Sequence, residues 1–196
     1  MGTPEPLHRY TLAEYYELEA AADARSEFYD GEIFLMAGGS ARHSMIGGNI
    51  LRYLGNQLEG TPCHPFGPDL KMKVKATGLS TYPDVSVYCG KRELDPLDRA
   101  AQTYLNPTLI VEVLSPTTET YDRGKKALNY RRVESLQMIL LVSQDTPGVE
   151  THVRQPDGSW TLREHDGMEK VLRLDAIGVD LPLAEIYRGV DFASEA

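Results

Sequence analysis

The stretch PTLIVEVLSP, residues 107–116, decides the fold because it places one acidic side chain inside an otherwise apolar run. Apolar and β-branched residues between two bounding prolines predict a short, buried strand. Side chains alternate along a strand, so Glu112 shares one face with Ile110 and Leu114. Burial of a carboxylate is costly and raises its pKa unless it meets a cation or hydrogen-bond donors. Two interpretations of Glu112 follow. In the first, it lies at a strand end and either reaches solvent or pairs with a structural arginine. In the second, it is a metal ligand or an acid–base residue.

The length and the amino-acid composition favour one globular domain over residues 1–196. The hydrophobic fraction is 41% and the charged fraction is 25%, which are ordinary values for a globular protein with its own core. Cys63 and Cys89 have no C-x-x-C spacing, so neither a zinc site nor a disulfide framework is expected. No segment approaches the ~18–20 consecutive apolar residues of a membrane span, and the N-terminus lacks the apolar core of a signal peptide. We expect a cytoplasmic protein that does not bind membranes.

The net charge of −9 limits how the protein can bind nucleic acid. Neutralisation of phosphates by basic residues supplies most non-specific affinity for DNA. The charge therefore argues against tight, indiscriminate DNA binding, although it leaves room for a local basic patch.

The pattern of apolar residues and turn signals predicts an α+β fold. Thr11 and Glu14 form a capping box that begins the first helix, and Asp30-Gly31 is a favoured hairpin turn. The expected helices cover residues 11–22, 40–60, about 122–134 and 182–188. The expected strands cover residues 63–66, 70–75, 82–89, 107–116, 136–143 and 170–174, with hairpins over 26–37 and 148–164. Residues 91–106 are polar and are expected to form a loop.

Two lysines follow the central strand, and helical spacing separates them. Lys126 shares a face with Tyr130 and Val133, whereas Lys125 lies on the neighbouring, more polar stripe. Asp122 is the expected N-cap of this helix. Lys126 is therefore the lysine expected to point toward the sheet.

Asp84, Glu112 and Lys126 form the candidate constellation. Two carboxylates from neighbouring strands suit a hard divalent cation such as Mg²⁺. Water and a substrate phosphate oxygen would complete the coordination of the cation. A lysine beside them can orient the attacking water and stabilise charge on phosphorus. The set can equally be a buried structural ion-pair network, since such networks also perturb pKa values.

The chain resembles the Uma-type restriction endonuclease family of the PD-(D/E)XK nuclease superfamily. The segments that carry this resemblance are SEFYDGEIFLMAGGSARHSMIGGNI, YPDVSVYC, PTLIVEVLSPTTETYDRGKKALNYRRVESL, ILLVSQD and LPLAEIYRGV. Pro83-Asp84 matches the PD element and Glu112 the acidic position. Leu114 stands where the superfamily pattern has its lysine, and Lys126 in the DRGKK run is the matching residue in this family.

The resemblance implies a restriction-endonuclease-like fold with a central mixed β-sheet flanked by helices. It implies that Glu27 approaches the metal site as a further catalytic residue, and it brings His43 and Gln144 into consideration. From the sequence alone, Glu27 and Glu32 are ordinary solvated hairpin charges, and His43 is more often a surface or core histidine than a ligand.

Three functions remain open at this point. The first is an Mg²⁺-dependent endonuclease, with Mn²⁺ as a substitute, that hydrolyses DNA phosphodiester bonds. Cutting both strands of a duplex requires two sites, so this function favours a homodimer. The second is a non-catalytic module that keeps the fold and binds nucleic acid or protein. The third is a structural protein in which the three residues form a buried ion-pair network.

Overall fold

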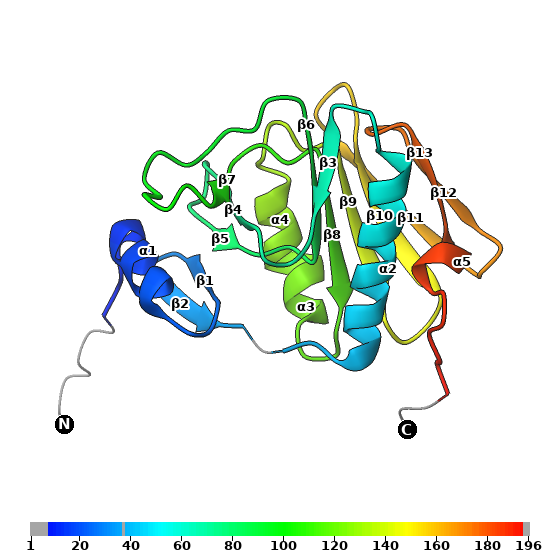
Figure 1. Cartoon of the computed structure of the whole chain (residues 1–196), viewed down its shortest axis with the longest axis horizontal. Coiled ribbons are helices and arrows are strands. Elements are labelled where there is room, and N and C mark those ends of the chain that lie inside the picture. The colour runs from blue at the N-terminus through cyan, green and yellow to red at the C-terminus, as the bar shows by residue number, and fades with distance from the viewer. Residues whose placement is uncertain (1–7, 37, 194–196) are drawn as a thin grey trace.

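A mixed six-stranded sheet forms the centre of the protein (Figure 1). The computed structural model describes residues 8–36 and 38–193. The strand order is β11-β10-β9-β8-β6-β3, in which β8 and β9 are parallel and the other neighbours antiparallel. The strands are β3 (Cys63–Phe66), β6 (Val85–Cys89), β8 (Leu109–Leu114), β9 (Met138–Ser143), β10 (Gly148–Arg154) and β11 (Trp160–Asp166). The predicted central strand is thus β8, and all six of its residues are buried.

One face of this sheet is covered by α2 (Ala41–Gln57). Ser40 caps the helix by accepting a hydrogen bond from the backbone N–H of His43. Ile46, Ile50 and Leu54, spaced four residues apart, are buried against the sheet. The C-terminal elements β12 (Val171–Leu174), β13 (Val179–Pro182) and α5 (Leu183–Ile186) complete the same core.

The opposite face carries a composite helix made of α3 (Glu119–Tyr121), η1 (Asp122–Lys126) and α4 (Ala127–Tyr130). Tyr130 and Val133 pack against the side of β8 that bears Ile110. The expectation that Asp122 caps this helix is wrong, because the helix begins at Glu119 and Asp122 lies within it. The η1 segment winds as a π-helix, a wide turn that frequently occurs at functional sites.

A second sheet of five strands packs beside the composite helix, and the sequence did not predict it as a sheet. Its order is β2-β1-β5-β4-β7. The strands are β1 (Ser26–Tyr29), β2 (Glu32–Leu35), β4 (Lys71–Lys73), β5 (Ser80–Thr81) and β7 (Thr103–Tyr104). The β1–β2 hairpin turns at Asp30-Gly31 as expected, with φ of 48° and 80°. The capping box of Thr11 and Glu14 begins α1 (Leu12–Ala21), which lies with β1 and β2 at the left of Figure 1.

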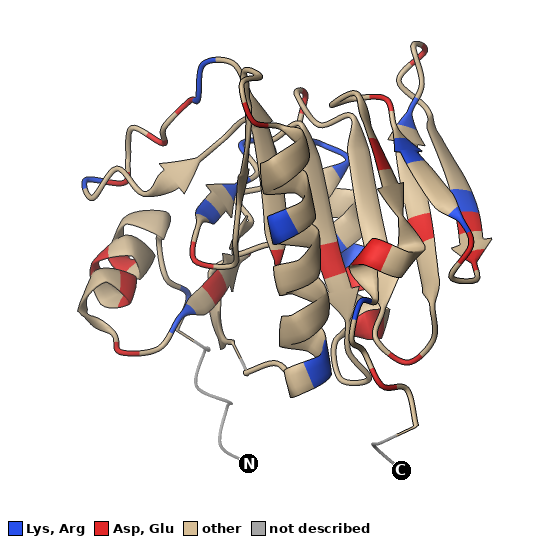
Figure 2. Ribbon diagram, turned by 45° about the vertical axis from the view of Figure 1, so that its right-hand side comes forward, with Lys and Arg blue, Asp and Glu red and all other residues tan. Residues whose placement is uncertain are grey.

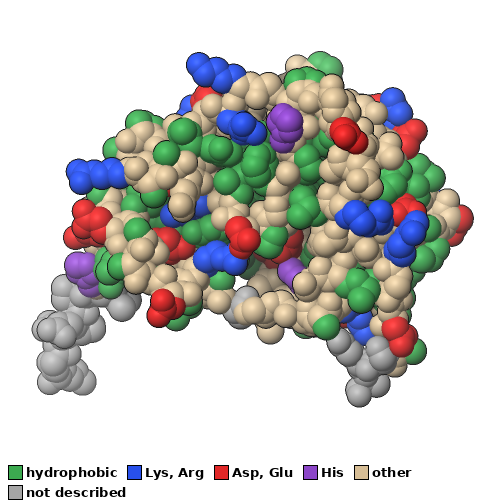
Figure 3. Space-filling model, viewed as in Figure 1, with side chains coloured by type: hydrophobic (Ala, Val, Ile, Leu, Met, Phe, Trp, Pro, Cys, Tyr) green, Lys and Arg blue, Asp and Glu red, His purple; other side chains and the backbone are tan. Residues whose placement is uncertain are grey.

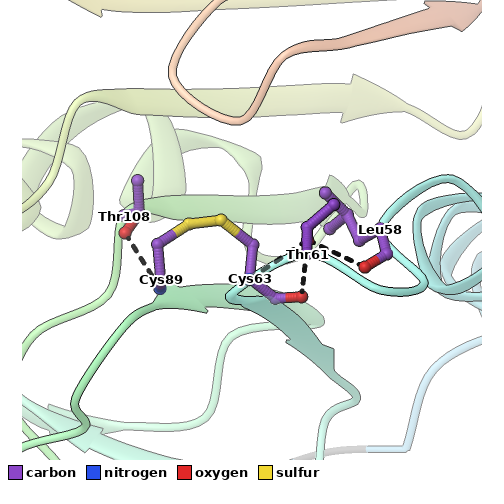
Figure 4. The surroundings of a disulfide bond; sticks show 5 residues. All are labelled: Leu58, Thr61, Cys63, Cys89 and Thr108. Carbon is purple, nitrogen blue, oxygen red and sulfur yellow. Dashed lines mark hydrogen bonds between the residues drawn. A yellow bond between two sulfur atoms is a disulfide. The ribbon is translucent and has the colours of Figure 1, made fainter.

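Cys63 and Cys89 form a disulfide, which corrects the expectation that no disulfide is indicated by their spacing (Figure 4). The two residues lie directly opposite each other in the antiparallel β3–β6 pair, with Cα atoms 3.9 Å apart. Their separation of 26 residues along the chain concealed this pairing. The bond ties the edge strand β3 to β6, the strand that follows Asp84.

Acidic residues are spread over the whole ribbon rather than gathered in one segment (Figure 2). In the part of the chain that the structure describes, no helix has both the length and the apolar character needed to cross a membrane.

Candidate active site

A cavity of about 690 Å³ lies where the two sheets meet the composite helix. It is lined from the β1–β2 hairpin, the start of α2, the ends of β6 and β8, and η1. Its walls carry all of the predicted site residues, namely Glu27, Asp84, Glu112, Lys126, His43 and Gln144. The structure therefore brings together side chains that lie far apart in the sequence.

Glu112 projects from the middle of β8 and is 4% exposed. Its Oε1 accepts a hydrogen bond from the Tyr130 hydroxyl and lies 3.1 Å from Lys126 Nζ. Burial raises the pKa of Glu112 well above its usual range, and the nearby charge of Asp84 adds to this effect. Glu112 is thus a buried carboxyl paired with a lysine, neither a solvated strand-end residue nor one paired with an arginine.

Asp84 lies immediately before β6 and is held by groups from two other elements. Its Oδ2 accepts a hydrogen bond of 2.7 Å from the Val113 backbone N–H and lies 3.3 Å from His43 Nε2. The hydrogen bond to Asp84 raises the pKa of His43, because it favours the protonated imidazole. His43 therefore approaches the site from the first turn of α2.

Lys126 is the cation at the centre of the cluster. Its Nζ lies 3.1 Å from Glu27 Oε1, 3.1 Å from Glu112 Oε1 and 3.5 Å from Asp122 Oδ1. Burial alone would lower the pKa of Lys126, but the surrounding carboxylates outweigh it and raise that pKa well above its ordinary value. Lys125 is exposed and Lys126 is buried, as the helical-face argument predicts.

Glu27 and Gln144 are placed by neighbouring strands. Glu27 on β1 is buried, and the Thr81 hydroxyl donates a hydrogen bond to it. It is therefore not the solvated hairpin charge that the local sequence suggests, whereas Glu32 is exposed. Gln144 follows β9, and its Oε1 accepts a hydrogen bond of 3.0 Å from the Ser40 hydroxyl.

Sequence reasoning missed the part that two other residues take in the cluster. Asp122 is buried beside Lys126, and burial raises its pKa. Tyr130 was placed on the face of Lys126, but its hydrogen bond to Glu112 was not foreseen. The signal was present in the spacing, because Asp122, Lys126 and Tyr130 recur every four residues.

The donor set fits a small, hard cation. Within the described residues, the side chain of Glu112 makes its hydrogen bond and its ion pair through Oε1, and that of Asp84 makes its contacts through Oδ2, which leaves a second oxygen on each carboxylate for a ligand. Over the described ranges, no group of three or more His, Cys, Asp or Glu residues is arranged to hold a metal. Mg²⁺ is commonly bound by only one or two carboxylates, together with water and substrate phosphates. Asp84 and Glu112 fit that requirement.

The chain is similar in sequence to a known family and to known proteins. Residues 12–184 match the model of the Uma2 family, which is described as "Putative restriction endonuclease". The uncharacterized protein slr1290 of Synechocystis sp. is 36% identical over 188 residues, covering 95% of this chain and 96% of that protein. A second uncharacterized Synechocystis protein, sll1609, is 33% identical over 154 residues, covering 79% of this chain and 86% of its own length.

A solved structure agrees with the fold. The crystal structure of a protein from Anabaena variabilis, described as a "putative nuclease belonging to DUF820", superposes with a TM-score of 0.73. It covers 90% of this chain and 97% of its own, at 20% sequence identity, a likeness that concerns the fold alone. The mixed sheet flanked by helices and the nuclease-like fold are thereby confirmed. The match over residues 12–184 shows that this chain belongs to the Uma2 family.

Proposed function

We propose that this protein is a metal-dependent endonuclease that hydrolyses phosphodiester bonds of DNA. The observation that carries this proposal is the convergence of Asp84, Glu112 and Lys126 on one cavity. The Uma2 family membership and the nuclease-like fold support it.

In this proposal Asp84 and Glu112, which line the cavity, would hold Mg²⁺ or Mn²⁺ through their carboxylate oxygens. The cation, when bound, lowers the pKa of a water ligand and shields the charge that builds up on the phosphate. Lys126 orients the attacking water and stabilises the added negative charge as a compact point charge. The water oxygen bonds to phosphorus and releases a proton to solvent, while the bond from phosphorus to the leaving sugar oxygen breaks and that oxygen takes up a proton from solvent.

Glu27 and Asp122 position Lys126 rather than touch the phosphate. Both carboxylates contact its ammonium from different elements, one from β1 and one from η1. They thereby hold Nζ beside Glu112. His43, which contacts Asp84, positions that carboxylate in the same way.

Thermal unfolding with EDTA, Mg²⁺ or Mn²⁺ tests the metal site. We expect the divalent cations to raise the Tm of the wild-type protein, because a ligand that binds the folded state stabilises it. Asp84→Ala should lose this rise and all cleavage of DNA. Asp157→Ala, which removes an exposed carboxylate in the β10–β11 turn, is the matched control and should respond like wild type.

Other results would favour the alternative functions. Loss of several kcal/mol of stability in Asp84→Ala, with no metal response in wild type, would make the cluster a structural ion-pair network. DNA or protein binding without turnover at any metal concentration would indicate a non-catalytic interaction module.

Two further properties belong to this proposal. A duplex substrate would require two sites for cleavage of both strands, which a homodimer would supply, whereas a single-stranded substrate requires one; sedimentation of the purified protein tests for the homodimer. A nuclease that acts on cellular DNA would work in the cytoplasm.

A further inference from the structure

The rim of the cavity carries large apolar side chains that face solvent. Phe34 is 47% exposed and Leu35 is 79% exposed, and both line the cavity together with Met36. They lie on and just after β2, an edge strand of the five-stranded sheet. Single exposed apolar residues are ordinary, but adjacent exposed apolar residues beside a cavity are typical of a ligand-binding surface. We call Phe34, Leu35 and Met36 the apolar rim.

The apolar rim lies next to the proposed reaction centre. In the β1–β2 register, Phe34 is directly opposite Glu27. Side chains directly opposite each other in an antiparallel pair lie on the same face, with Cβ atoms ~4.5–5.5 Å apart. Glu27 in turn contacts Lys126. The Phe34 ring is therefore one strand spacing from the residue that holds the catalytic ammonium.

The charges around the cavity do not suit a duplex. Among the described residues that line it, the lysines and arginines are Lys125 and Lys126 alone, and Lys126 is engaged by three carboxylates. On the face shown in Figure 3, basic side chains lie singly or in pairs among acidic and apolar ones and form no continuous band. Duplex binding depends on basic side chains along the phosphate backbone.

We propose that the apolar rim is a stacking platform for unpaired bases, so that the substrate is single-stranded DNA or an unpaired segment of DNA. Aromatic platforms bind single strands because every base presents a π-face, and this stacking adds to the contacts that cations make with the phosphates. The base beside the scissile phosphate stacks on Phe34 and contacts Leu35, while Lys125 contacts a neighbouring phosphate. This inference rests on the proposed function, because it places the strand relative to the reaction centre.

Fluorescence anisotropy with a labelled single-stranded oligonucleotide and its duplex, in EDTA to prevent turnover, tests the proposal. We expect the single strand to bind more tightly than the duplex. Phe34→Ala should weaken single-strand binding about tenfold, since loss of one base–aromatic stack costs ~1–3 kcal/mol. Phe34→Trp should restore it, and Phe34→Leu should not, because a leucine keeps the apolar surface but removes the ring.

Leu35→Ala has a matched control in Leu162→Ala. Leu162 is 50% exposed on β11, which is likewise an edge strand but belongs to the other sheet. Leu35→Ala should weaken single-strand binding, and Leu162→Ala should leave it unchanged. All these side chains are exposed, so the variants should keep the wild-type Tm.

The outcomes separate this inference from the proposed function. Single-strand binding that depends on Phe34, without cleavage in Mg²⁺ or Mn²⁺, would sustain the platform and overturn the nuclease. Mg²⁺-dependent cleavage of duplex that is indifferent to Phe34 and Leu35 would sustain the nuclease and overturn the platform. A change from dimer to monomer in Phe34→Ala would show that a second copy covers the apolar rim, which also overturns it. Absence of both binding and cleavage would overturn both.

Discussion

At the scale of single residues, Lys126 holds together three buried carboxylates that would otherwise repel one another. We predict that Lys126→Met abolishes cleavage and lowers the free energy of unfolding at neutral pH by about 3–5 kcal/mol, because buried charges are left without their partner. Lys125→Met is the matched control. The Lys125 side chain is exposed, so the free energy of unfolding should change by no more than about 0.5 kcal/mol in this variant. Denaturant unfolding of both variants measures the difference.

The same variant should show a defined dependence on pH. The pKa values of Glu112 and Asp122 are raised in the folded protein, so the folded state favours their protonated forms. This stabilising contribution is present at low pH and is lost as pH rises through the raised pKa values. Removing the lysine raises these pKa values further. The penalty of Lys126→Met should therefore shrink as pH falls toward the ordinary carboxyl range, and a penalty that grows on acidification would contradict the assignment.

At the scale of elements, the turn before α2 places His43 against Asp84, and Gly39 makes room for it. A Cβ at residue 39 would lie 2.7 Å from His43 Nδ1, closer than real Cβ atoms approach a neighbour. We predict that Gly39→Ala moves the imidazole beyond hydrogen-bond distance of Asp84. Gly38→Ala is the control, because a Cβ there meets no atom within 4 Å. Crystal structures of both variants give the distance, and a retained contact of 3.3 Å in Gly39→Ala would refute the prediction.

The disulfide fixes the edge strand β3 to the strand that follows Asp84. Its loop of 26 residues corresponds to about 3.5 kcal/mol of stabilisation in the chain-entropy model. We predict that Cys63→Ser with Cys89→Ser lowers the free energy of unfolding by this order. A reducing agent should destabilise wild type by the same amount and leave the double variant unaffected. Equal sensitivity of both proteins to the reductant would show that the bond does not form in solution.

Local signals in the sequence predicted the elements that depend on neighbours along the chain. The Thr11 capping box, the Asp30-Gly31 turn and the apolar spacing of α2 each act within a few residues, and all three are found in the structure. The alternation along residues 109–114 placed Glu112 on the face of β8 that Tyr130 covers. Helical spacing then distinguished Lys126 from Lys125.

Features that depend on distant pairings could not be read from the chain. The strands β5 and β7 have two residues each and exist because β4 pairs with both. Glu27 is buried where it contacts Lys126, a residue that lies far along the chain. The wide η1 turn lies in a run, DRGKK, that carries no pattern distinguishing a π-helix from an α-helix.

At the scale of the whole molecule, the net charge of −9 bears on how strongly the affinity for nucleic acid should depend on salt concentration. A single strand that releases about one counterion per contacted phosphate loses affinity with a slope of roughly −0.7 per contact. With Lys125 and Lys126 as the lysines and arginines among the described residues that line the cavity, we predict a shallow slope of about −1 to −2. Titrations across salt concentrations measure it. A slope steeper than about −4 would reveal a basic surface elsewhere on the protein or on its assembly.

The residues that line the cavity lie between Glu27 and Gln144 in a chain of 196 residues, and this has a consequence during synthesis. Contacts join Glu27 to Lys126, His43 to Asp84 and Ser40 to Gln144. A ribosome-bound chain therefore cannot assemble the cluster before Lys126 has left the exit tunnel, and the Gln144 side of the cavity closes later still. Premature termination anywhere before Lys126 yields a fragment without the proposed chemistry. On the proposed function, this topology leaves such partial products of the gene unable to cut DNA.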